Sequence, residues 1–102
     1  QYVFFTWRGF YLFNDILIKP NNNELHVYSY FDREFICSVK LNDKIQIECY
    51  DDIVFLSGEL KQNTITNQLH LVDRNGFVCP IEFGTVYKKL WLIEDESMFN
   101  KF

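Results

Sequence analysis

The sequence predicts one mainly β domain that ends in a single α-helix. From residue 2 to residue 83, short apolar and aromatic runs alternate with turn residues, as antiparallel strands do. After Gly84 the chain changes to a stretch of strong helix formers without Gly or Pro. The 102 residues are 48% hydrophobic and 19% aromatic, which is enough for one packed core and too apolar for a disordered chain.

The runs before Gly84 predict about seven or eight short strands. Lys44–Tyr50 alternates strictly between apolar and polar residues, which is typical of a half-buried strand. Asn75-Gly76 between two such runs is a strong hairpin signal, and Pro80 in the second run indicates an edge strand or a bulge. Ser57–Asn67 is polar and is the part of the chain that the pattern assigns least firmly.

The stretch "FYLFNDILIKP", Phe10–Pro20, is an apolar run interrupted by the polar pair Asn14-Asp15. Asn and Asp tolerate tight-turn geometry, so a polar pair at this point has a conformational reason. We therefore expect two strand segments around Asn14-Asp15 rather than one buried strand.

An amphipathic helix is predicted over residues 85–101, with Thr85 as its N-cap. Its apolar residues recur at spacings of three, four or seven, which places them on one helical face. They are Tyr87, Leu90, Trp91, Met98 and Phe102. One helix can cover only one side or one opening of the sheet, so we expect a bent antiparallel sheet or partly open barrel that the helix plugs.

Composition argues against several functional classes. The net charge is −4 and the basic residues do not cluster, so a nucleic-acid surface is not expected. Three cysteines, Cys37, Cys49 and Cys79, lie in apolar runs and do not form a disulfide framework, which favours a reducing, cytoplasmic location. The sequence contains no apolar run of membrane-spanning length and no signal-peptide pattern.

No enzyme motif is recognisable. His26 and His70 are isolated from each other and from the cysteines, so a metal site is not expected. The sequence has neither a Gly-rich phosphate loop nor a nucleophile elbow. We therefore expect no catalytic residue and no cofactor.

Four stretches together resemble a known family. "RGFYLFNDILI", "YSYFDREFICSVKL", "QLHLVDRNGFVCPIEF" and "YKKLWL" resemble successive parts of pleckstrin homology (PH) domains, most closely those that follow Dbl-homology domains in Rho guanine-nucleotide exchange factors. In the last stretch, Trp91 matches the family's helix tryptophan. Two departures are visible: Ser38–Leu41 lacks the proline of the usual Ile-Pro-Leu motif, and "YVFFTW" lacks the usual Gly and basic residues.

The resemblance implies a seven-stranded barrel capped by one C-terminal helix, forming a single domain over 1–102 excised from a longer protein. It implies a non-catalytic targeting or scaffolding module that contacts a protein, such as a Rho-family GTPase or an adjacent exchange domain. Phosphoinositide-binding members of the family hold the phosphates with basic residues of the first two strands and their loop. Because few bases occur there in this acidic chain, we expect at most weak phosphoinositide binding, at the periphery of a membrane. The candidate lipid-binding residues are Arg8, Lys19, Arg33 and Lys40.

Some aromatic side chains must lie on the outside of such a sheet, where they suit a protein contact. The candidates are Tyr2, Phe4, Trp7, Tyr28, Tyr30 and Tyr50. Trp91 fits either core packing under the helix or a partner anchor. A second hypothesis is therefore a standalone β-rich inhibitor or immunity-type protein, which blocks a basic partner through an acidic, aromatic surface.

The first prediction concerns lipid. We expect weak sedimentation with phosphoinositide-containing vesicles, lost at moderate salt, because a few exposed cations on an acidic chain attract a membrane only electrostatically. Arg8→Ala should reduce this binding further. Tight binding that discriminates between headgroups would contradict the expectation.

Overall fold

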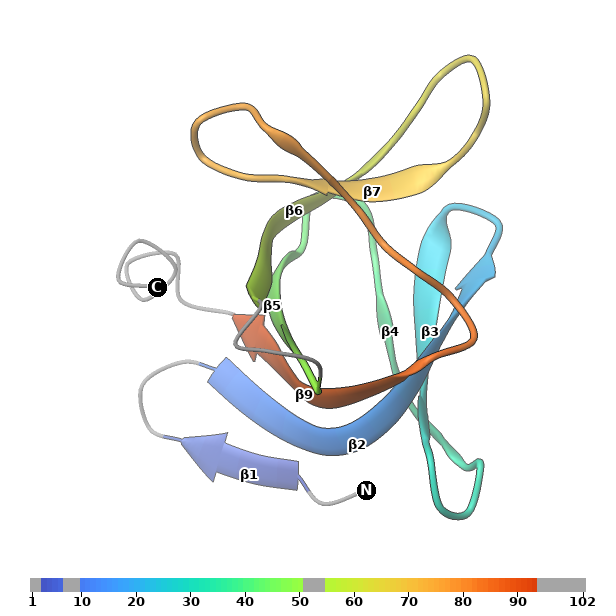
Figure 1. Ribbon diagram of the computed structural model, residues 1–102, viewed down its shortest axis with the longest axis vertical. Coiled ribbons are helices and arrows are strands. Elements are labelled where there is room, and N and C mark those ends of the chain that lie inside the picture. Colours follow the sequence, from blue (N-terminus) through green and yellow to red (C-terminus); the bar gives the residue numbers. More distant parts are fainter. Residues whose placement is uncertain (1–2, 7–9, 51–54, 94–102) are drawn as a thin grey trace.

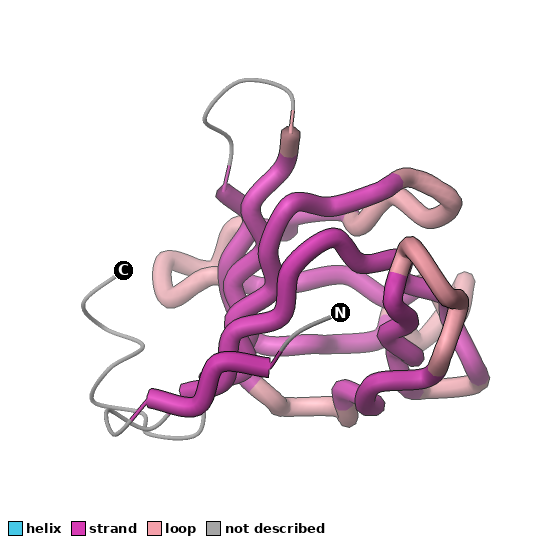
Figure 2. Tube along the Cα trace, turned by 90° about the horizontal axis from the view of Figure 1, so that it is seen from below, coloured by secondary structure: helices cyan, strands magenta, loops and turns pink. Residues whose placement is uncertain are grey.

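The computed structural model describes the backbone of residues 3–6, 10–50 and 55–93, and the side chains of residues 14–50 and 55–93. These residues form nine antiparallel strands in one strongly bent sheet (Figure 1). Figure 2 shows strands and loops, and no helix, in this part of the chain. The strands are β1 (Val3–Thr6), β2 (Phe10–Asn21), β3 (Glu24–Ser29), β4 (Phe35–Val39), β5 (Lys44–Cys49), β6 (Phe55–Gln62), β7 (Leu69–Val72), β8 (Val78–Pro80) and β9 (Val86–Ile93).

The strand order is β4-β3-β2-β9-β5-β6-β7-β8, with β1 paired to β2. Two meanders, β2–β4 and β5–β8, are thus joined by β9, which lies between β2 and β5. The mainly β, antiparallel prediction is confirmed. The Asn75-Gly76 hairpin joins β7 to β8, and Pro80 lies on β8 at the end of the sheet, as expected.

The helix predicted over residues 85–101 is wrong for Val86–Ile93, which form β9, and residues 94–101 lie outside the described part. The error has a structural cause. Glu48 and Cys49 of β5 pair with Lys89 and Tyr87, so Lys88 is an extra residue on β9. This bulge shifts the strand alternation and buries Tyr87 and Leu90, three residues apart, which imitates helical spacing.

Asp15 marks a bend in β2. The strand is continuous from Phe10 to Asn21, not split by a turn, but Asp15 has a left-handed φ of 54°. Along one edge, β1 pairs with residues 10–13 and β3 with residues 16–21, so β2 changes neighbour at this point. The Asp15 carbonyl accepts from the Tyr30 N–H at 2.9 Å, and its carboxylate accepts from the Tyr50 hydroxyl.

The polar segment after residue 56 continues as β6 up to Gln62. It forms a strand because its inward positions are small or aliphatic, namely Gly58 and Leu60, while its outward charges are paired. Glu59, for example, lies 3.0 Å from the Lys44 Nζ across the β5–β6 pair. A Cβ atom at Gly58 would lie 2.4 Å from the Val72 carbonyl oxygen.

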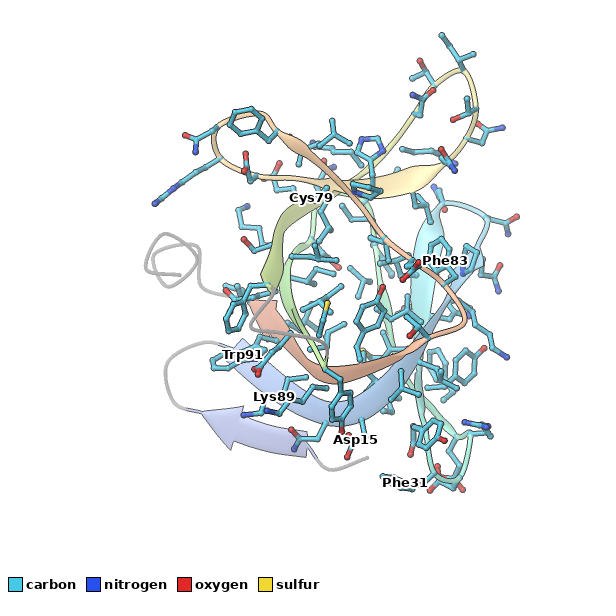
Figure 3. All side chains as sticks on the ribbon, in the orientation of Figure 1. Asp15, Phe31, Cys79, Phe83, Lys89 and Trp91 are labelled. Carbon is cyan, nitrogen blue, oxygen red and sulfur yellow. The ribbon has the colours of Figure 1, made fainter. Side chains whose placement is uncertain are left out.

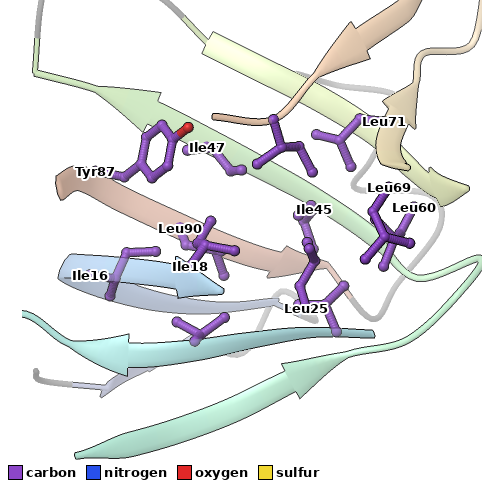
Figure 4. Close-up of a cluster of buried hydrophobic side chains, with 13 residues drawn as sticks. Ile16, Ile18, Leu25, Ile45, Ile47, Leu60, Leu69, Leu71, Tyr87 and Leu90 are labelled. Atoms are coloured by element: carbon purple, nitrogen blue, oxygen red, sulfur yellow. The ribbon is translucent and has the colours of Figure 1, made fainter. Parts of the chain in front are cut away.

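The core is almost wholly aliphatic (Figure 4). Alternate residues of the strands point inward, and Tyr87 is the one aromatic residue among the buried side chains of the described part. The cluster contains Ile16, Ile18, Leu25, Val27, Val39, Ile45, Ile47, Leu60, Leu69, Leu71, Ile81, Tyr87 and Leu90. Many of the described aromatic rings therefore remain available for the outer surface.

Gly58→Ala should destabilise the fold by roughly 3–5 kcal/mol, because it adds backbone strain at φ +150° and a clash with the Val72 carbonyl. Gly76→Ala is the matched control. Gly76 also has a positive φ, +87°, but its Cβ would meet no atom within 4 Å, so the cost should be only about 1–2 kcal/mol. Urea unfolding of both variants measures this difference, and equal losses would contradict the close approach of β6 and β7.

Candidate interaction surface

An exposed group of aromatic rings covers the outside of β3, β4 and their connecting turn. The alternation of β3 places Leu25, Val27 and Ser29 in the interior and turns His26 and Tyr28 outward. We call this surface the aromatic face; its members are His26, Tyr28, Tyr30, Phe31 and Phe35.

The rings of the aromatic face pack edge to face. Phe35 contacts His26 at a centroid distance of 5.3 Å and Tyr28 at 5.8 Å. Tyr30 and Phe31 are 5.3 Å apart. Such pairs stabilise the local structure, yet 54% of Phe35 and 69% of Phe31 stay exposed. The surface is therefore ordered but not covered by the rest of the described chain.

The β3–β4 turn holds Phe31 at its tip, as Figure 3 shows. The Ser29 N–H donates to the Glu34 carbonyl at 2.8 Å, and the Arg33 N–H donates to the Ser29 carbonyl at 3.0 Å. Arg33 takes a left-handed φ of 61° to close the turn. The Glu34 N–H donates to the Asp32 carboxylate, which lowers the pKa of that carboxyl.

Two of the predicted lipid-binding residues belong to this surface. The Lys19 Nζ lies 5.3 Å from the centre of the Tyr28 ring, and the Arg33 guanidinium lies 4.9 Å from that of Tyr30. The Arg33 Nη1 also donates to the Tyr30 carbonyl at 2.5 Å. Both cations are thus placed over tyrosine rings, in cation–π geometry.

The third predicted lipid-binding residue, Lys40, lies away from Arg33. Lys40 follows β4 at the end opposite to Arg33, and a strand of five residues separates the two by roughly 17 Å. Arg8 lies outside the described residues. The described cations thus spread along the surface instead of converging, whereas a headgroup pocket needs several donors around one anion.

The predicted outward aromatics are only partly the ones observed. Tyr30 and Tyr50 are exposed and Tyr28 is half-buried, whereas the side chains of Tyr2, Phe4 and Trp7 lie outside the described part. The sequence reasoning missed the two most useful rings, Phe31 and Phe35. The signal was present in "FDREF", where two phenylalanines flank a charged turn. Trp91, expected on a helix, is half-buried on β9 opposite Leu12 and Gln46.

The cysteines and histidines form no metal-binding group with the acidic residues in the part of the chain that is described. Cys37, Cys49 and Cys79 are all half-buried and form no disulfide. Burial, assisted by Asp43, raises the pKa of Cys37 to about 11, and burial also raises that of Cys79. Both thiols therefore stay protonated and weakly nucleophilic at neutral pH.

Comparisons with protein-family models, with curated proteins and with solved structures find no match for this chain. The resemblance to pleckstrin homology domains accordingly stays a prediction carried by the sequence stretches alone. Across residues 3–6, 10–50 and 55–93, no helix has the length and apolar character needed to cross a bilayer.

Cys37 should make stability fall at high pH. Its folded pKa of about 11 exceeds the ordinary 9.0, so folding favours the neutral thiol. This contribution is complete below pH 9 and is lost as the pH rises towards 11. We expect the free energy of unfolding to fall more steeply over this window in the wild type than in Cys37→Ala, as measured by urea titrations. Parallel curves would contradict the assignment.

Proposed function

We propose that this chain is a non-catalytic binding module that contacts a protein partner through its aromatic face. The observation that carries the proposal is that Tyr30 and Phe31 of the β3–β4 turn and Phe35 at the start of β4 are all exposed, with Arg33 between them in the chain and placed over Tyr30. Aromatic residues and Arg are enriched at the centres of protein interfaces, where each ring contributes a large contact area. Most of the rings are already fixed by edge-to-face contacts, so little side-chain entropy would be lost on binding.

A protein is favoured over a lipid headgroup because acidic groups share the surface with the cations. Asp32 and Glu34 flank Arg33 in the same exposed turn. Their carboxylates repel phosphate, so a membrane would be attracted only weakly and mainly at low salt. Phosphoinositide contact through Lys19, Arg33, Lys40 and Arg8 is therefore at most a secondary part of the proposal.

The family-level part of the proposal rests on sequence resemblance. It holds that the domain is PH-like, cytoplasmic and without a cofactor, and that it regulates a neighbouring Rho exchange domain. In that setting the aromatic face would contact either the exchange domain or its GTPase. The stretches "RGFYLFNDILI" and "YKKLWL" support this context.

A second candidate is the inhibitor hypothesis, which the charges of the β3–β4 turn favour. Asp32 and Glu34 lie beside the two most exposed rings of the aromatic face, Phe31 and Phe35, and the chain carries a net charge of −4. An acidic, aromatic surface of this kind suits a basic partner. Both candidate functions use the aromatic face, and they differ in the charge of the partner that this face binds.

Selection from a random displayed-peptide library tests both candidates. We expect enriched peptides whose binding falls at least tenfold for the double variant Phe31→Ser/Phe35→Ser. Phe77→Ser is the matched control, because Phe77 is equally exposed, at 68%, but lies in the β7–β8 turn. Peptides rich in Lys and Arg would favour the inhibitor, and peptides without a basic bias would favour the scaffolding module.

The proposal fails under either of two results. One is that no peptide is enriched above background. The other is that the enriched peptides bind the double variant as well as they bind the wild type, while the variant retains its amide NMR dispersion.

A further inference from the structure

A cavity of about 370 Å³ opens between the ends of β5 and β6 and the segment that leads into β9. Its walls come from distant parts of the chain. The described wall residues are Cys49, Leu56, Pro80, Ile81, Glu82 and Tyr87. The volume lies within the range of small-molecule sites, and most of the wall is apolar. None of the wall residues belongs to the aromatic face.

Tyr87 anchors the rim of this cavity. Its ring is buried at the edge of the core beside Ile47, as Figure 4 shows. The Tyr87 hydroxyl donates to the Glu82 carbonyl at 2.6 Å and accepts from the Glu82 N–H at 3.1 Å. Burial raises the pKa of Tyr87, so the hydroxyl remains a protonated donor at neutral pH. The backbone of Glu82 is therefore held in place by a side chain of the core.

The polar groups of the cavity define what it can bind. The Tyr87 hydroxyl is already engaged by Glu82, and a cysteine thiol is only a weak hydrogen-bonding group. Glu82 is the one charged residue among the described wall residues, it is exposed, and its carboxylate is near enough to the Tyr87 hydroxyl to help raise the pKa of that group. A ligand that matches this wall has an apolar body and one positive charge at its outer end.

We propose that this cavity binds a small organic cation with a short apolar body, such as a primary alkyl amine. The apolar body lies against Leu56, Ile81 and the Tyr87 ring. The ammonium group lies at the rim beside the Glu82 carboxylate. An anion of the same size meets the same apolar wall but is repelled by Glu82.

Three probes of equal chain length test the charge preference: hexylamine, hexanol and hexanoate. Each is titrated into ¹⁵N-labelled protein and followed by amide chemical shifts. We expect saturable shifts at Cys49, Leu56, Ile81 and Tyr87, with hexylamine bound about 2- to 5-fold more tightly than hexanol, as an exposed ion pair allows. Hexanoate should bind most weakly. Glu82→Gln should make hexylamine and hexanol equal.

A second experiment fills the cavity with a larger side chain. Leu56→Trp should abolish saturation by all three probes, and Ile81→Phe serves instead if Leu56→Trp loses its amide dispersion. The double variant Phe31→Ser/Phe35→Ser should bind hexylamine like the wild type, which separates this site from the aromatic face. Chemical shifts that rise without saturation, or that map to residues away from the cavity, would overturn the proposal. It would also be overturned if Glu82→Gln still bound hexylamine more tightly than hexanol.

Discussion

The pairing of β9 with β2 on one side and β5 on the other is the constraint on which the rest of the structure depends. The two meanders, β2–β4 and β5–β8, also share one core cluster and are linked at the β4–β5 turn, where Asn42 and Asp43 exchange hydrogen bonds with Leu60. Leu90 of β9 is fully buried between them. Because β9 pairs with strands far earlier in the chain, the sheet forms only after contacts of large sequence separation are made, which predicts slow folding.

This arrangement also determines where the aromatic side chains lie. Once β9 joins the two meanders, the core cluster is filled by Ile, Leu and Val, and Tyr87 is the exception among its buried members. The rings of β3 and β4 are then left on the outside, where they pack against one another and beside Lys19 and Arg33. Tyr87 also shapes the cavity, because its hydroxyl holds the backbone of Glu82 in the cavity wall. Both candidate binding regions thus follow from how the core is filled.

Sequence reasoning was most successful where alternation was regular. The strand at Lys44–Cys49, the hairpin at Asn75-Gly76 and the edge position of Pro80 could all be predicted. It failed at β9 because the bulge at Lys88 gives the buried residues a helix-like spacing. It did not assign Ser57–Gln62 to a strand, because Gly58 and the paired charges of β6 hide the alternating pattern. Of the candidate site, Lys19, Tyr28, Tyr30 and Arg33 were predicted individually. Their placement on one surface with Phe31 and Phe35 depends on the β3–β4 register, which composition does not determine.

Native-state hydrogen exchange tests the central position of β9 most directly. If β9 joins the two meanders, the amide protons of Lys89–Leu92 should exchange only through global unfolding. Their opening free energy should then equal that from urea unfolding and exceed that of the β8 amides at the end of the sheet. Fast exchange of the β9 amides, while β2 and β5 stay protected, would contradict the account.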